Sequence, residues 1–150
     1  MDTPKATIGD IDLTVAHDQL EAPSGVTELV EHVAAEQGFS VRDVSIVLTD
    51  HASVKALNET HLERSYETDV LAFDLRDEAG RESKELDGEI YVDLDTALER
   101  APEFGTDYDG EVRRYVIHGV LHLMGYRDDN PNGRDEMKRL ENLYLGFASS

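Results

Sequence analysis

The sequence contains no cysteine and no long apolar run. Without cysteine, neither a disulfide framework nor a thiolate metal site can form, so any metal must be bound by histidine, carboxylate or water. No apolar stretch approaches the roughly 18 residues that a membrane span requires, and the acidic start "MDTPKATIGDIDLTV" lacks the apolar centre of a secretory signal. We therefore expect a soluble, cytoplasmic protein whose residues 1–150 form a single domain.

Positive charge is also scarce. The chain has 33 acidic residues against 14 lysines and arginines, which gives a formal net charge of −19. Such an excess repels anionic partners and opposes compaction in dilute salt, whereas concentrated salt screens the repulsion within a few ångströms. We therefore expect adaptation to a salt-rich cytoplasm. The alternative is an ordinary acidic protein whose partner carries the basic surface.

The hydrophobic pattern predicts an α+β domain with a small mixed sheet of about four strands. Strands are expected at residues 11–15, 44–49, 68–75 and 89–94, and helices at 26–37, 54–62, 96–100, 108–124 and 134–147. A charged loop is expected at 76–88 and a turn at 130–133. The main elements follow the order β-α-β-α-β-β-α-α, with a zinc-binding helix near the C-terminus.

The stretch "HGVLHLMGYRDD", residues 118–129, suggests a metal site. Residues four apart on a helix point to nearly the same side, so His118 and His122 can direct their ring nitrogens at one ion. Gly125 is suited to a left-handed C-terminal cap that turns the chain back, and either Asp128 or Asp129 can then supply a third ligand. The alternative is a pair of core histidines with one hydrogen bond each.

The spacing His-x-x-x-His-x-x-Gly-x-x-Asp resembles that of the metzincin proteases, whose motif begins His-Glu. Residue 119 is glycine instead, so the glutamate that would deprotonate the metal-bound water is missing. Glu111 lies two turns earlier, roughly 10 Å away along a helix axis, and cannot replace it directly. A zinc metalloprotease is therefore the weaker interpretation.

The same stretch resembles the signature of the YbeY family of metal-dependent endoribonucleases and ribosomal RNA maturation factors, His-Gly-x-Leu-His-Leu-x-Gly-Tyr-Asp-His. The matching residues are His118, Gly119, Leu121, His122, Leu123, Gly125 and Tyr126. The segments "LNETHLERSYETDVLAFDL" and "DGEIYVDLDTALERA" also resemble the family, and together the similar segments run from about Val44 to Tyr144. The family's third zinc ligand is a histidine at the position of Asp128, and we expect the Asp128 carboxylate to replace it.

This resemblance implies one Zn²⁺ ion held by His118, His122 and Asp128, with a zinc-activated water that cleaves phosphodiesters. It implies a preference for single-stranded RNA and a role in small-subunit ribosomal RNA maturation and ribosome quality control. Ribosomal RNA and ribosomal proteins are the expected partners, and DNA is not. The catalytic general base and the substrate-binding residues stay unassigned.

The arginine that follows the family's Asn segment is replaced by Leu62, with Arg64 two residues later. Arg64, Arg114 or Arg127 can supply phosphate binding instead, although a surface ion pair is the favoured interpretation for each. Five of the ten arginines (113, 114, 127, 134 and 139) lie within 27 residues around the metal motif, which offers a local basic face despite the net charge. The main rival function is a non-catalytic ribosome assembly factor whose zinc is structural.

Several other residues are secondary candidates. Thr68 and Asp69 begin a predicted strand. They either belong to the functional site or form only local hydrogen bonds. Asn58 can bind substrate or backbone, and Tyr126 can stack on a base or pack against the helix end. The remaining histidines have no ligand-like partner in the sequence and are expected to be solvated: His17, His32, His51 and His61.

Overall fold

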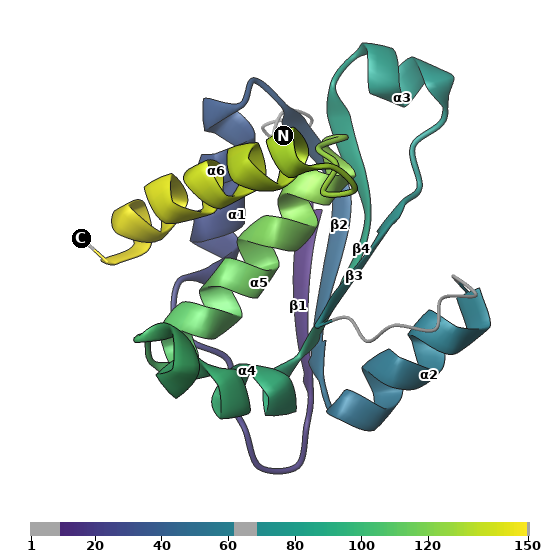
Figure 1. Cartoon of the computed structure of the whole chain (residues 1–150). Helices are drawn as coiled ribbons and strands as arrows, with labels where there is room; N and C mark the ends of the chain where they lie inside the picture. The colour runs from purple at the N-terminus through teal and green to yellow at the C-terminus, as the bar shows by residue number, and fades with distance from the viewer. Residues whose placement is uncertain (1–9, 62–68, 150) are drawn as a thin grey trace, which may run out of the picture.

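The computed structural model describes residues 10–61 and 69–149 and contains a four-stranded mixed sheet with helices packed beside it (Figure 1). In chain order the described elements are β1 (Asp10–Ala16), α1 (Val26–Glu36), β2 (Ser40–Thr49), α2 (His51–His61), β3 (Val70–Asp74), α3 (Glu78–Glu82), β4 (Glu85–Asp93), α4 (Leu94–Arg100), the 3₁₀ helix η2 (Ala101–Phe104), α5 (Tyr108–Leu123) and α6 (Pro131–Ser149). The predicted α+β architecture is confirmed.

The strands lie in the order β1-β2-β4-β3, with β1, β2 and β4 parallel and β3 antiparallel at one edge. Side chains alternate between the two faces of a strand. One face of the central pair is completely buried, through Val44, Ile46, Leu48, Leu86, Ile90 and Val92. The opposite face of β4 carries Asp87, Glu89 and Tyr91, which are only partly buried. The sheet is therefore amphipathic, and its apolar face forms the core.

Helix α5 covers this apolar face and contacts β3, β4, α1, α4 and α6. Figure 1 shows α1, α5 and α6 on one side of the sheet, with α2 projecting from the other side near the end of β2. The inner face of α1 is formed by five buried residues: Val26, Leu29, Val30, Val33 and Ala34. On α6, Met137, Leu140 and Tyr144 are buried, whereas Phe147 is 46% exposed.

Several predicted boundaries were wrong, and β2 begins at Ser40 rather than at residue 44. The charged loop contains the short helix α3, capped where Asp77 accepts a hydrogen bond from the Gly80 amide at 2.8 Å, and β4 begins at Glu85 rather than at residue 89. Helix α6 begins at Pro131 rather than Arg134, because the Asn130 side chain accepts from the Gly133 amide at 2.7 Å and caps the helix. Proline is tolerated in a first turn, where its missing N–H has no helical partner.

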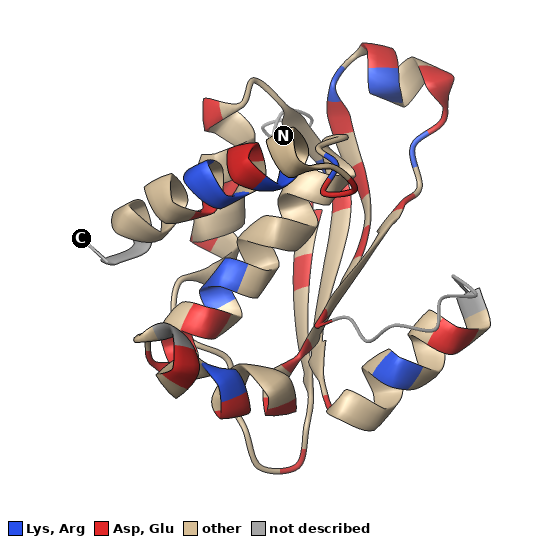
Figure 2. Ribbon diagram, viewed as in Figure 1, with Lys and Arg blue, Asp and Glu red and all other residues tan. Residues whose placement is uncertain are grey.

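Acidic residues are spread over every helix of the described chain (Figure 2). This distribution agrees with a repulsive surface rather than with one acidic patch. Within the described residues, no helix is both long enough and apolar enough to pass through a membrane.

Candidate metal centre

Helix α5 carries two of the three candidate ligands on a rigid support. Its N-terminus is capped by Asp107, whose carboxylate accepts a hydrogen bond from the Gly110 amide at 2.8 Å. Its apolar stripe is completely buried through Val112, Val116, Ile117, Val120 and Leu121. His118 and His122 lie beside this stripe, and the side chain of each is 28% exposed. The helix therefore holds both rings at the boundary between core and solvent.

Gly119 faces the sheet rather than the histidines. A Cβ atom at this position would lie 2.6 Å from Cγ2 of Ile90 and 3.2 Å from Cγ1 of Val70. No side chain fits there without displacing β4, so glycine is what allows α5 to approach the strands this closely. The space also excludes a glutamate at the position that the protease motif requires.

The chain reverses immediately after α5. Gly125 has a φ of +105°, its amide donates to the carbonyl of His122, and the amide of Tyr126 donates to that of Leu121. This pair of bonds is a Schellman motif, and the predicted left-handed cap is confirmed. The turn brings Asp128 back beside the two histidines.

Three side-chain atoms converge at this point. Nε2 of His118 and Nε2 of His122 lie 3.0 Å apart, and Oδ2 of Asp128 lies 3.4 Å and 3.3 Å from them. The three residues together could hold a metal ion. An ion with tetrahedral bonds of about 2.0–2.1 Å separates its ligand atoms by roughly 3.3 Å. The spacing therefore fits zinc.

The hydrogen bonds on the far side of each ring indicate which nitrogen faces the centre as an acceptor. Nδ1 of His118 donates to Oε2 of Glu141 at 2.7 Å, and Nδ1 of His122 donates to the backbone carbonyl of Tyr126 at 3.0 Å. Each Nε2 lone pair is then directed at the other and at the Asp128 carboxylate. Three electron-rich atoms repel one another at this range unless a proton or metal cation lies between them.

The two rings have opposite pKa shifts. Burial alone would lower the pKa of His118, but its hydrogen bond to Glu141 and the charges of Glu141 and Asp128 raise that pKa above its ordinary value. Burial and the neighbouring His118 lower the pKa of His122. His122 is therefore neutral at neutral pH, as a metal ligand must be, whereas a metal ion competes with a proton for His118.

Asp129, the competing candidate for third ligand, points elsewhere. Its carboxylate accepts hydrogen bonds from Arg127 Nη2 at 2.8 Å and Arg127 Nε at 3.2 Å, and from the Asn130 side chain. The hydrogen bond from Arg127 lowers the pKa of Asp129. The structure thus brings Asp128, and not Asp129, to the histidines.

Glu141 of α6 was not a candidate in the sequence. Its two oxygens accept hydrogen bonds from Nδ1 of His118 and from Nη1 of Arg114, the latter at 3.2 Å. Arg114, considered for phosphate binding, is therefore engaged in this network. A signal for Glu141 existed, because a charged residue one turn after Met137 interrupts the apolar face of α6.

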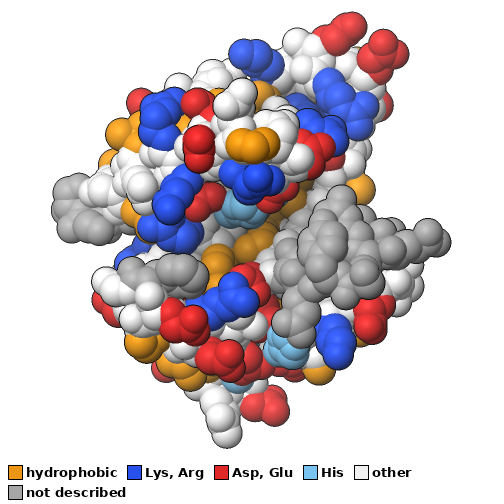
Figure 3. Space-filling model, viewed as in Figure 1, with side chains coloured by type: hydrophobic (Ala, Val, Ile, Leu, Met, Phe, Trp, Pro, Cys, Tyr) orange, Lys and Arg blue, Asp and Glu red, His pale blue; other side chains and the backbone are white. Residues whose placement is uncertain are grey.

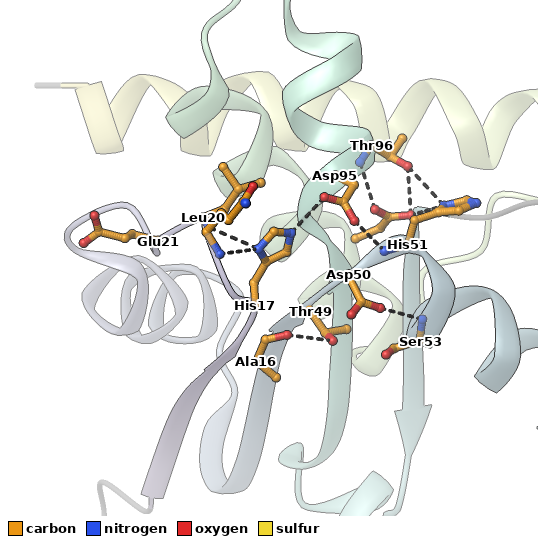
Figure 4. Close-up of polar contacts among 12 residues, drawn as sticks. Ala16, His17, Leu20, Glu21, Thr49, Asp50, His51, Ser53, Asp95 and Thr96 are labelled. Atoms are coloured by element: carbon orange, nitrogen blue, oxygen red, sulfur yellow. Dashed lines mark hydrogen bonds and ion pairs between the residues drawn. The ribbon is translucent and has the colours of Figure 1, made fainter.

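Two histidines expected to be solvated are held by aspartates instead (Figure 4). His17 Nε2 donates to Asp95 at 2.8 Å, and His51 Nδ1 donates to Asp93 at 2.6 Å, with Asp93 completely buried. These contacts join the ends of β1, β2 and β4. His32 stacks on Phe147 with ring centroids 3.6 Å apart. The expectation of a solvated ring was therefore wrong for His17 and His32, whereas the His51 side chain is 42% exposed.

The remaining candidates have structural contacts or lie outside the described residues. Asn58 is only 3% exposed, and the Asp69 carboxylate lies 3.4 Å from Arg100 Nη1 while its carbonyl accepts from the Asp93 amide. The Tyr126 hydroxyl donates to Gln37 at 2.7 Å while its ring packs against the core. Leu62, Arg64, Thr68 and the side chain of His61 lie outside the described residues.

A hollow with a hydrophobic floor opens on the face shown in Figure 3, with a histidine side chain and several lysine or arginine side chains at its rim. The candidate ligands are accessible from solvent, with side-chain exposures of 28%, 28% and 45% for His118, His122 and Asp128. Among the described residues, 10–61 and 69–149, these exposures leave the solvent side of the three atoms open to water or substrate.

Comparison with known proteins gives concordant results. A family model described as Endoribonuclease YbeY matches residues 8–148. A protein named Endoribonuclease YbeY from Salinibacter ruber is 44% identical over 140 residues, which cover 89% of each chain. One of the same name from Bacteroides thetaiotaomicron is 33% identical over 121 residues, covering 81% of this chain and 85% of the relative.

The solution structure of TM1509 from Thermotoga maritima has the same fold, with a TM-score of 0.62 and 27% identity over 91% of this chain and 87% of that protein. The family match includes the helix that carries His118 and His122 and the loop that carries Asp128. On this combined evidence, the chain belongs to the Endoribonuclease YbeY family.

Proposed function

We propose that this protein is a zinc-dependent endoribonuclease whose single metal ion is held by His118, His122 and Asp128. The observation that carries the proposal is the convergence of their three lone-pair donors at the end of α5, in a family whose members are named endoribonucleases. We also propose that residues 1–150 form one domain. Asp128 replaces the histidine of the family signature, and carboxylate oxygen binds zinc at a similar distance.

The proposed substrate is single-stranded RNA, within small-subunit ribosomal RNA maturation and ribosome quality control in the cytoplasm. Ribosomal proteins are proposed as additional partners. A zinc ion held by His118, His122 and Asp128 would supply Lewis-acid activation of a water molecule and of a phosphoryl oxygen. The chain's own residues supply the ligands and leave one side of the centre open, while the apolar packing of α5 limits the access of water from behind.

Phosphate contact requires local positive charge, because the net charge of −19 repels RNA. Arg127 is suited to this role, since its side chain is 74% exposed and its partner Asp129 is 56% exposed. An exposed ion pair of this kind contributes little stability, so the guanidinium can exchange its carboxylate for a phosphate at small cost. Arg114 is less suited, because Glu141 and Asn142 already hold it.

Two rival functions receive less support. A structural zinc would require a fourth protein ligand, and Asp129, the nearest acidic residue in sequence, is hydrogen-bonded to Arg127. A metalloprotease would require a glutamate at position 119, where a Cβ would meet Ile90 at 2.6 Å. The open ligand position favours the hydrolase.

The decisive experiment combines metal analysis with cleavage of a structured ribosomal RNA by wild type, His118→Ala and the control His32→Ala. His32 is a half-buried histidine of α1 that stacks on Phe147 and is not among the three candidate ligands. We expect wild type and His32→Ala to carry zinc and cleave, and His118→Ala to lose both properties. Equal cleavage by His118→Ala would contradict the metal-dependent mechanism, and zinc binding without cleavage by wild type would favour the assembly factor.

A further inference from the structure

Glu141 is a carboxylate on the buried face of α6. The residue is 7% exposed, and Met137, Leu140 and Tyr144 share this face of the helix. Burial of a carboxylate costs free energy unless hydrogen-bond donors or positive charges compensate it. The position of Glu141 therefore depends on specific partners rather than on apolar packing.

Both oxygens of Glu141 are bound, and both donors come from α5. Oε2 accepts from Nδ1 of His118 at 2.7 Å, and Oε1 accepts from Nη1 of Arg114 at 3.2 Å. Arg114 is in turn held through Nη2, which donates to Oδ1 of Asn142 at 3.1 Å. The carboxylate is thus fixed between one candidate ligand and a guanidinium.

The two histidines at the centre are oriented by different kinds of acceptor. Nδ1 of His122 donates to the backbone carbonyl of Tyr126, which the Schellman turn places and which no side-chain substitution removes. Nδ1 of His118 depends on the Glu141 side chain. A carboxylate acceptor keeps the proton on Nδ1, leaves Nε2 as the lone-pair donor and increases its basicity as a metal ligand.

We propose that Glu141 is a positioning residue of the metal centre, which fixes the His118 ring with Nε2 directed at the ion while Arg114 fixes Glu141. The inference rests on the proposed function, because it requires a metal ion at His118, His122 and Asp128. Glu141 acts through His118, since its own oxygens are occupied by His118 and Arg114.

The test compares Glu141→Gln with the matched control Glu136→Gln. Glu136 lies on the same helix and carries the same charge, but its exposed carboxylate pairs with Arg139 at 2.7 Å instead of with a candidate ligand. Zinc Kd is measured by competition with a chromogenic chelator, and the protonation pattern of the His118 ring is read from ¹⁵N spectra of the histidine side chains. The ¹⁵N pattern separates ring positioning from a general loss of stability.

We expect Glu141→Gln to raise the zinc Kd roughly 10- to 100-fold, the usual range for loss of a carboxylate behind a histidine ligand. The His118 spectrum should change from the Nδ1–H form to a mixture of tautomers, and Glu136→Gln should alter neither readout. Arg114→Gln should also raise the zinc Kd, but by a smaller factor, because it removes a hydrogen bond that holds Glu141 and leaves the Glu141 carboxylate in place. If Glu141→Gln does not fold, the zinc Kd of Arg114→Gln tests the positioning role of Glu141 instead.

An unchanged zinc Kd and an unchanged His118 spectrum in Glu141→Gln would overturn the positioning role and leave the metal centre intact. Absence of zinc binding by the wild type would overturn the proposed function and this inference together. The two failures are therefore distinguishable.

Discussion

Gly119 of α5 and Ile90 of β4 are in such close contact that a Cβ at position 119 would lie 2.6 Å from Ile90 Cγ2. We expect Gly119→Ala to destabilise the fold by about 1–2 kcal/mol, because the strain of overpacking exceeds the gain of roughly 1 kcal/mol in helix propensity. Gly146→Ala on α6 is the control, since its Cβ meets nothing within 4 Å. Urea denaturation that ranked Gly119→Ala as stable as wild type would show that the helix can move away from the sheet.

The assignment of the third ligand predicts opposite behaviour for two adjacent aspartates. Removal of Asp128 should weaken zinc binding by at least roughly 100-fold, since even groups behind the ligands contribute 10- to 100-fold. Asp129→Ala should leave zinc binding intact, because Asp129 is hydrogen-bonded to Arg127. Chelator competition measures both. Retention of zinc by Asp128→Ala together with its loss from Asp129→Ala would reverse the assignment.

The contacts of Asp95 predict a pH-dependent contribution to stability. Hydrogen bonds from the His51 amide and the His17 ring lower the pKa of Asp95 below 3.8. A carboxyl group with a lowered folded-state pKa stabilises the fold at pH above its unfolded value, and this stability is lost as pH falls through the folded value. Asp95→Asn should therefore cost about 1 kcal/mol at neutral pH, less than the roughly 1.5–3 kcal/mol of a hydrogen bond to a charged group because the side chain is 45% exposed, and progressively less below pH 3.8.

Urea denaturation at about pH 7 and about pH 3 checks this expectation. The control is Asp18→Asn, an exposed aspartate adjacent to His17, whose effect should be small at both values. If Asp95→Asn lost the same unfolding free energy at both pH values, the negative charge of the Asp95 carboxylate would contribute nothing to stability.

The net charge of −19 predicts stabilisation by salt. Screening shortens from roughly 10 Å at 0.1 M to about 3 Å at 1 M, which removes repulsion between the carboxylates on neighbouring elements. The melting temperature should rise by more than the roughly 2–4 °C that 1 kcal/mol gives a chain of this size. Salt should raise the melting temperature less in a variant with four exposed glutamates changed to glutamine: Glu31, Glu36, Glu82 and Glu99. Equal increases in melting temperature for the wild type and the variant would show that salt acts by general salting-out rather than by screening these carboxylates.

The features that the sequence could predict are those with a local physical cause. Helical periodicity places His118 and His122 on one side, and a glycine at the helix end allows the left-handed turn that follows Leu123. The same logic predicted the helix α1 and the strand β2. Each of these expectations depends on residues within about one or two turns of one another.

The features that the sequence could not predict depend on residues brought together by the fold. His17 and Asp95 are 78 positions apart, and His118 and Glu141 are 23 apart. No periodicity relates such pairs, so His17 and His51 were expected to be solvated. The start of α6 was missed for another reason, since Asn-Pro-Asn-Gly suits both a turn and a capped helix beginning at Pro131.

The candidate ligands differ in how firmly the fold supports them. His118 and His122 stand on a helix that is packed against the sheet without room for a methyl group at Gly119, so neither can move independently of the core. Asp128 stands on the short connection between α5 and α6, and its side chain is 45% exposed. The position that departs from the family signature is therefore the one at which evolution can exchange a ligand without repacking the interior.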